Sequence, residues 1–118
     1  MIYIMNTIIA DSVVSEFTRY LENKFPEILE AIVLYGSRAR GDFQEHSDYD
    51  FLVLYHDSVN KKNIQDAVLD AEVLVMDKFE KLASSLIWSD LEWKRKQKFP
   101  LGINILKEGK YVWTKKSP

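Results

Sequence analysis

Two aspartates, Asp48 and Asp50, lie two residues apart where an apolar segment begins, and this pair is the clearest candidate for chemistry. The segment that follows, 51–55, is rich in β-forming residues, so both side chains would point to one face of a strand, roughly 6–7 Å apart. At that distance two carboxylates repel each other, which favours a raised pKa or a cation between them. Mg²⁺ often combines one or two carboxylates with substrate phosphates. Standing alone, the same spacing is also typical of an exposed strand end.

A candidate phosphate site precedes the acidic pair. Gly36 and Ser37 end the apolar segment 31–35, and a glycine at such a place lets the backbone approach a ligand closely. If a short helix follows through Arg38 and Arg40, backbone N–H groups, the serine hydroxyl and the guanidinium groups would together favour an anion such as phosphate. Of the two arginines, Arg40 is the stronger candidate by its position. The stretch is neither a P-loop nor a dinucleotide-binding turn, because it lacks their glycine and lysine spacing.

These two features occur in a recognisable order. The segment 33–41, VLYGSRARG, followed by 47–53, SDYDFLV, resembles the signature of the nucleotidyltransferase superfamily, in the spacing of its minimal nucleotidyltransferases. The resemblance implies a nucleoside triphosphate, with ATP as the substrate, and two magnesium ions. The site residues that it implies are Gly36, Ser37, Arg38 and Arg40 for the nucleotide, and Asp48 and Asp50 for the metal and catalysis.

The resemblance also implies a third carboxylate on the next strand, where it would complete the metal site and activate the acceptor hydroxyl. The apolar segment 71–76 is the best match to that strand and offers Glu72, with Asp70 as the alternative. A glutamate in place of the usual aspartate moves the carboxylate by about one bond length, and a 1 Å displacement can cost about 100-fold in rate. We therefore expect the glutamate to affect catalysis more than nucleotide binding.

The remaining pattern predicts short alternating elements, as in an α/β (α+β) nucleotidyltransferase fold with a short mixed sheet flanked by helices. A first helix should begin after Asp11 and Ser12 and end before Pro26. The predicted strands are 31–35, 49–55 and 71–76, with a further short strand near the end of the segment 103–113, after Gly109. The predicted helices are 59–68, capped by Ser58, one from the capping box of Asp77 and Glu80 to about Trp88, and one from Ser89 toward Phe99.

Length and composition set the outer limits. The chain has 118 residues, 47% of them hydrophobic, and no cysteine, so we expect one domain over 1–118 without disulfides or thiolate metal ligands. No apolar run approaches the roughly 18 residues of a membrane span, and the N-terminus lacks the basic region of a signal peptide. We therefore expect a cytoplasmic protein that does not bind membranes.

Charge is distributed unevenly along the chain. Residues 1–93 hold 8 Lys/Arg and 17 Asp/Glu, whereas 94–118 hold 8 and 1. A lysine-rich stretch is most often a solvated helix face, so direct nucleic-acid binding is not favoured. The basic end could still dock an acidic partner. Trp88 and Trp93 are either core residues or the flanks of such a partner surface.

The resemblance implies a magnesium-dependent nucleotidyltransferase that moves AMP from ATP to a hydroxyl group. A chain of this size has little room for an acceptor domain, and minimal nucleotidyltransferases are often paired with helical HEPN ribonuclease toxins. We therefore expect an antitoxin that modifies a tyrosine of such a toxin. Two alternatives stay open: a non-catalytic nucleotide-binding antitoxin or scaffold, and a small-molecule nucleotidyltransferase with a helical partner subunit. The sequence leaves open whether the protein forms a homo- or hetero-oligomer.

Overall fold

A four-stranded mixed sheet forms the centre of the computed structural model, which describes residues 11–57 and 60–115. The strands are β1 (Leu29–Tyr35), β2 (Tyr49–Tyr55), β3 (Ala83–Ser89) and β4 (Lys110–Thr114), in the order β3-β2-β1-β4. β1 is antiparallel to both β2 and β4, whereas β2 and β3 are parallel. The predicted α/β architecture with a short mixed sheet flanked by helices is confirmed.

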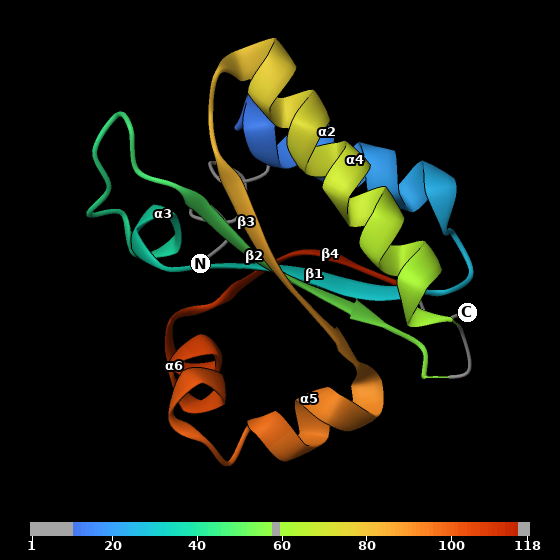
Figure 1. Cartoon of the computed structure of the whole chain (residues 1–118). Helices are drawn as coiled ribbons and strands as arrows, with labels where there is room; N and C mark the ends of the chain where they lie inside the picture. Colours follow the sequence, from blue (N-terminus) through green and yellow to red (C-terminus); the bar gives the residue numbers. More distant parts are fainter. Residues whose placement is uncertain (1–10, 58–59, 116–118) are drawn as a thin grey trace.

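Helices cover both faces of the sheet (Figure 1). On one face lie α2 (Ser12–Lys24) and α4 (Lys61–Phe79), and on the other lie α5 (Asp90–Lys96) and α6 (Pro100–Glu108). The short helix α3 (Ser37–Arg40) follows β1 directly. Within the described residues no helix is both long and apolar enough to cross a membrane.

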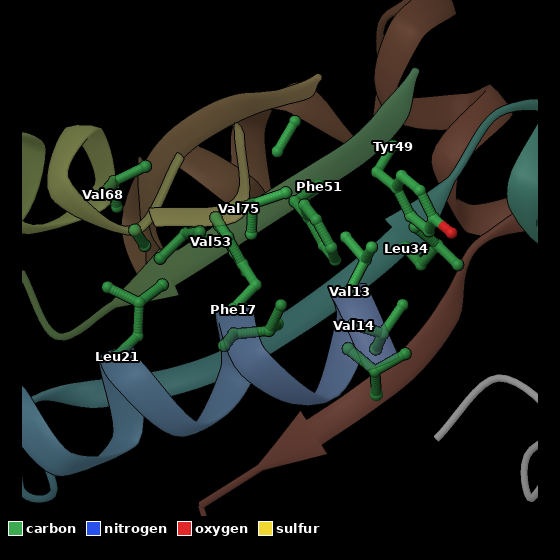
Figure 2. Packing of buried hydrophobic residues seen from close by; sticks show 14 of the residues in the cluster. Val13, Val14, Phe17, Leu21, Leu34, Tyr49, Phe51, Val53, Val68 and Val75 are labelled. Atoms are coloured by element: carbon green, nitrogen blue, oxygen red, sulfur yellow. The ribbon is translucent and has the colours of Figure 1, made fainter. Parts of the chain in front are cut away.

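The main core lies between the sheet and the pair α2 and α4. The predicted first helix is confirmed, and Asp11 caps it by accepting hydrogen bonds from the N–H groups of Val13 and Val14 at 2.8 and 3.3 Å. Phe17 of α2 stacks on Phe51 of β2 with ring centroids 4.0 Å apart (Figure 2). Alternate residues of β2 face this core, as expected for a strand whose side chains alternate between two faces.

A second, smaller core lies on the opposite face, under α5 and α6. Its buried residues are Ala31, Val33, Leu52, Leu54, Trp88, Trp93 and Ile105. The rings of Trp88 and Trp93 stack with centroids 5.9 Å apart and are only 8% and 9% exposed. These tryptophans are therefore core residues, and the idea that they flank a partner surface is wrong.

The segment between β2 and β3 differs from the prediction. A single helix, α4, replaces the expected helix 59–68 and the expected strand 71–76. Its buried residues recur at helical spacing: Ile64, Ala67, Val68, Ala71 and Val75. Asn60 caps this helix by accepting from the N–H of Lys62 at 2.8 Å, and the proposed cap Ser58 lies outside the described residues. The apolar run 71–76 is buried on only one side and thus continues the helix.

The predicted helix ending near Trp88 is also wrong. Glu80 is not part of a capping box but closes α4 in a left-handed conformation, with φ 55°. The chain then forms β3, which is parallel to β2 because the long helix α4 returns it to the same end of the sheet. Farther along, α5 begins after Ser89 as predicted, with a capping box between Ser89 and Glu92, and the short strand after Gly109 is confirmed as β4. However, α5 ends at Lys96 rather than near Phe99, and α6 is a nine-residue helix where the sequence indicates only one helical turn.

Candidate active site

The antiparallel pairing of β1 and β2 brings the glycine turn and the acidic pair together. Tyr35, the last residue of β1, lies opposite Asp50, and Gly36 follows directly. Gly36 has φ +74°, and a methyl group built on it would collide with Oδ2 of Asp50. This position therefore requires glycine for two separate reasons, its backbone conformation and its contact with the carboxylate.

Asp50 lies at the start of β2, on the side away from the main core, and Asp48 comes just before the strand. Tyr49, Phe51 and Val53 point into the main core, so Asp50, which is half-buried, points to the opposite face. Asp48 is exposed and precedes the strand by one residue. Burial raises the pKa of Asp50, the nearby Asp48 raises it further, and Arg40 acts in the opposite direction. Asp48 and Asp50 are therefore near enough for their charges to interact, although only Asp50 is a residue of the strand.

Arg40 and the N–H group of Gly36 both donate to a residue that the motif did not include, Glu108. Its Oε1 accepts from the Gly36 N–H at 3.1 Å, and Nη1 of Arg40 lies 3.1 and 3.0 Å from Oε1 and Oε2. Nε of Arg40 also donates to Asp42, at 3.2 Å. The sequence carried one signal for this residue, since Glu108 is the single acid among the last 25 residues, 94–118.

Arg38 points elsewhere and fastens the loop that carries Asp48. Its guanidinium group donates to the carbonyl oxygens of Glu45 at 2.9 Å and of Ser47 at 3.1 and 3.3 Å. The same group lies between the rings of Phe43 and Tyr49, 4.2 and 4.3 Å from their centroids. The guanidinium group of Arg38 is thus engaged by the loop 41–48 and the first residue of β2, whereas that of Arg40 is engaged by Glu108 and Asp42.

We expect Arg38→Ala to destabilise the protein by about 2 kcal/mol, because it removes charge-assisted hydrogen bonds and two cation–π contacts. Urea unfolding measures this loss. Arg19→Ala is the matched control: this exposed arginine pairs with Glu16 at 3.8 Å and donates to the Ser15 hydroxyl at 3.2 Å, and such exposed contacts should contribute less than about 0.5 kcal/mol. An Arg38→Ala protein with unchanged stability but weaker ATP binding would instead make Arg38 a nucleotide contact.

The predicted third carboxylate does not join the other two. Glu72 lies on α4, which covers the face of the sheet opposite to Asp50, and burial raises its pKa while the neighbouring Ser85 lowers it. Asp70 is exposed on the same helix and accepts a long hydrogen bond from the hydroxyl of Tyr20, at 3.5 Å. The strand prediction on which both assignments depended is wrong.

The strand beside Asp50 is β3, and it carries no acid. Ser84 is the register partner of Asp50, and none of the residues 83–89 is Asp or Glu. In the described part of the chain, no group of three or more His, Asp or Glu side chains is arranged to hold a metal ion. The two carboxylates Asp48 and Asp50 have the oxygen donors that suit Mg²⁺, so they fit the metal-binding half of the signature.

Comparison with known sequences identifies the family. The profile of the family described as polymerase beta, nucleotidyltransferase, matches residues 16–117, which is nearly the whole chain. The chain belongs to this family. Its glycine turn and paired aspartates therefore belong to a nucleotidyltransferase domain, and the resemblance found in the motif is confirmed.

Individual relatives agree with this assignment. This nucleotidyltransferase is 26% identical over 103 residues to a candidate protein adenylyltransferase of Methanocaldococcus jannaschii, covering 87% of this chain and 97% of the relative. Its fold is similar to that of a candidate nucleotidyltransferase from Sulfolobus solfataricus, with TM-score 0.61 and 20% identity over 96% of this chain and 86% of the other. Its fold is also similar to that of one chain in the structure of a tri-AMPylated Shewanella oneidensis HEPN toxin in complex with MNT antitoxin, with TM-score 0.52 and 18% identity over 86% of this chain and 70% of the other.

Proposed function

We propose that this nucleotidyltransferase transfers AMP from ATP to a hydroxyl group of a partner protein, a tyrosine of a helical HEPN toxin. The observation that carries the proposal is the meeting of Asp48 and Asp50 with the donors of Gly36 and Arg40 at one end of the sheet. The name of the M. jannaschii relative supports protein adenylylation, and the S. oneidensis complex supports a HEPN toxin as the acceptor.

Each site residue has a task in this proposal. Gly36 would receive a phosphate group on its N–H, because nothing but hydrogen stands on its Cα. Ser37 would add a hydroxyl donor, and Arg40 a positive charge for the departing pyrophosphate. Asp48 and Asp50 would hold magnesium, which when bound neutralises phosphate charge and aligns the triphosphate.

The reaction itself is a substitution at phosphorus. The acceptor oxygen forms a bond with the α-phosphorus of ATP, the bond from that phosphorus to the bridging oxygen breaks, and pyrophosphate leaves while the hydroxyl proton is released. Such chemistry depends mainly on positioning and on charge stabilisation. The buried strands β1 and β2 provide that positioning, because their pairing sets Gly36, just after β1, beside Asp50 of β2.

The basic end of the chain supports a protein acceptor. The cations of α5, Lys94, Arg95 and Lys96, are exposed, and they lie on the same side of the sheet as Asp50. An acidic partner surface would be attracted to α5 while its hydroxyl group approaches the carboxylate pair. This charge layout agrees with the expected acidic helical partner.

The test is mass spectrometry of the product of the neighbouring gene after incubation with this protein, ATP and magnesium. A mass increase of one AMP group on a tyrosine is expected, and heat-inactivated protein serves as the control. If a stable complex forms but no adduct appears, the catalytic proposal is wrong. If no complex forms and the product is unmodified, the protein acceptor is wrong and a small-molecule hydroxyl becomes the acceptor to test.

A second candidate function is favoured by one observation, the absence of an acid from β3 beside Asp50. Without a third carboxylate, the same site would still bind a nucleotide and the protein would act on its partner by contact alone. A complex whose stability rises with ATP, without modification of the toxin, is the result that this second candidate predicts.

A further inference from the structure

The carboxylate of Glu108 lies on the same donors that we assign to a phosphate group. Glu108 is the last residue of α6, 72 positions after Gly36, yet its Oε1 accepts from the Gly36 N–H at 3.1 Å. Nη1 of Arg40 lies 3.0 Å from the other oxygen, Oε2. A carboxylate presents two oxygens that share a negative charge, as two of the oxygens of a terminal phosphate do.

We propose that Glu108 occupies the position of a nucleotide phosphate group on Gly36 and Arg40, and that a nucleotide binds there only after the Glu108 side chain has moved away. The inference rests on the proposed function for the identity of the natural ligand. The Glu108 carboxylate then competes with the ligand for the same donors and lowers the affinity of the site.

The backbone holds Glu108 at this place by strand register. Lys110 of β4 lies opposite Leu34 of β1, and this pairing brings the end of α6, two residues earlier in the chain, beside the turn that follows β1. Ile105, one turn before Glu108, is buried in the second core, and its carbonyl oxygen accepts from the Gly109 N–H at 2.7 Å. Because the backbone is fixed on both sides, only rotation of the Glu108 side chain is needed to vacate the position.

The charge of Glu108 acts on Asp50 of the carboxylate pair as well as on Arg40, whose side chain is 45% exposed. Glu108 is only 25% exposed at its side chain, and its charge raises the pKa of Asp50. The folded protein therefore places a third negative charge near the carboxylate pair, where Arg40 and the Gly36 N–H are the groups that compensate it. Magnesium bound with a triphosphate would balance the negative charges of Asp48 and Asp50. The phosphate oxygens would accept hydrogen bonds from the Gly36 N–H and Arg40 in place of Glu108, so each donor would keep a partner.

Tripolyphosphate without metal is the probe that tests the inference, because it needs neither a nucleoside site nor transfer activity. A site that is free for only a fraction of the time binds with an affinity reduced by that fraction. In calorimetric titrations, Glu108→Gln should therefore bind tripolyphosphate at least about tenfold more tightly than the parent. Circular dichroism checks that the variant is folded, and Glu108→Ala repeats the measurement without any side chain that could reach Gly36.

Asp42→Asn is the matched control, because Asp42 also pairs with Arg40 and its removal also deletes one negative charge. The acceptor of the Gly36 N–H is Glu108 and not Asp42, so we expect the affinity of the Asp42→Asn protein for tripolyphosphate to change less than about threefold. Equal gains for Asp42→Asn and Glu108→Gln would overturn the proposal, since net charge would then explain both. An unchanged or weaker affinity in folded Glu108→Gln would overturn it as well, because Glu108 would then position Arg40 rather than compete.

Titration with ATP and magnesium separates this inference from the proposed function. If Glu108→Gln gains affinity for tripolyphosphate but neither protein binds the nucleotide, the proposed function fails and the competition by Glu108 stands. If both proteins bind the nucleotide and tripolyphosphate equally well, the nucleotide site on which the proposed function depends stands and the competition fails.

Discussion

Asp48→Asn combined with Asp50→Asn is expected to lower the rate of AMP transfer by about 1,000-fold or more, because a catalytic metal supplies several kcal/mol and each 1.4 kcal/mol is a factor of ten. The magnesium-dependent part of ATP binding should disappear in the same variant. Calorimetric titration with ATP in the presence and absence of magnesium measures the binding. Asn has nearly the shape of Asp, so the loss would report the missing charges.

The double variant should remain folded, so that a loss of binding can be assigned to the missing carboxylates. In the parent, burial and Asp48 raise the pKa of Asp50, so ionisation of Asp50 at neutral pH costs folding free energy. Two neutral side chains avoid that cost, and the variant should be at least as stable as the parent at pH 7. Asp66→Asn with Asp77→Asn, two exposed acids of α4, is the charge-matched control. Unchanged magnesium-dependent binding in the Asp48 and Asp50 variant would exclude this pair as the metal site.

Gly36→Val is expected to weaken ATP binding by at least about 100-fold, because its side chain would enter the space between the backbone and Asp50. The positive φ of this residue adds backbone strain of about 1–3 kcal/mol. Gly36→Ala should lose affinity too, since its first carbon already collides with Oδ2 of Asp50. Calorimetry gives the affinity and circular dichroism gives the fold.

Gly41 offers a control that separates strain from collision. It also has a positive φ, +90°, but a methyl group built on it would meet no atom within 4 Å. Gly41→Ala should therefore lose stability by a similar amount while its ATP affinity stays within about twofold of the parent. A folded Gly36→Ala protein that binds ATP as tightly as Gly41→Ala would remove Gly36 from the nucleotide site.

The motif region could be predicted from the sequence because several local signals agree there. The strands β1 and β2 are buried and rich in β-branched and aromatic residues, and the stretch between them is mostly polar and exposed. In the segment 71–76 the local sequence signals do not agree on one element. Its Glu72, Val73, Leu74, Val75 and Met76 suit either a strand or a helix, and only the packing of Ala71 and Val75 on the main core decides for the helix.

The contribution of Glu108 could not be predicted from local sequence. It reaches Gly36 through the pairing of β4 with β1, a contact between residues 72 positions apart, and no spacing rule within the motif encodes such a pairing. The role of Arg38 was missed for a related reason. Its partners in the loop 41–48 are backbone carbonyl oxygens, which every sequence carries, so no side-chain pattern points to them.

The sheet separates two cores, and this division should govern how relatives of the protein diverge. The residues of α2 and α4 are packed on the face away from the acidic pair, so substitutions there that preserve volume should change melting temperature without changing ligand affinity. The second core also supports the helix that ends in Glu108. A substitution at Ile105 or Trp93 that displaces α6 would therefore change substrate affinity without touching the substrate. Among relatives, we expect the main core to vary independently of the ligand and the second core to vary together with it.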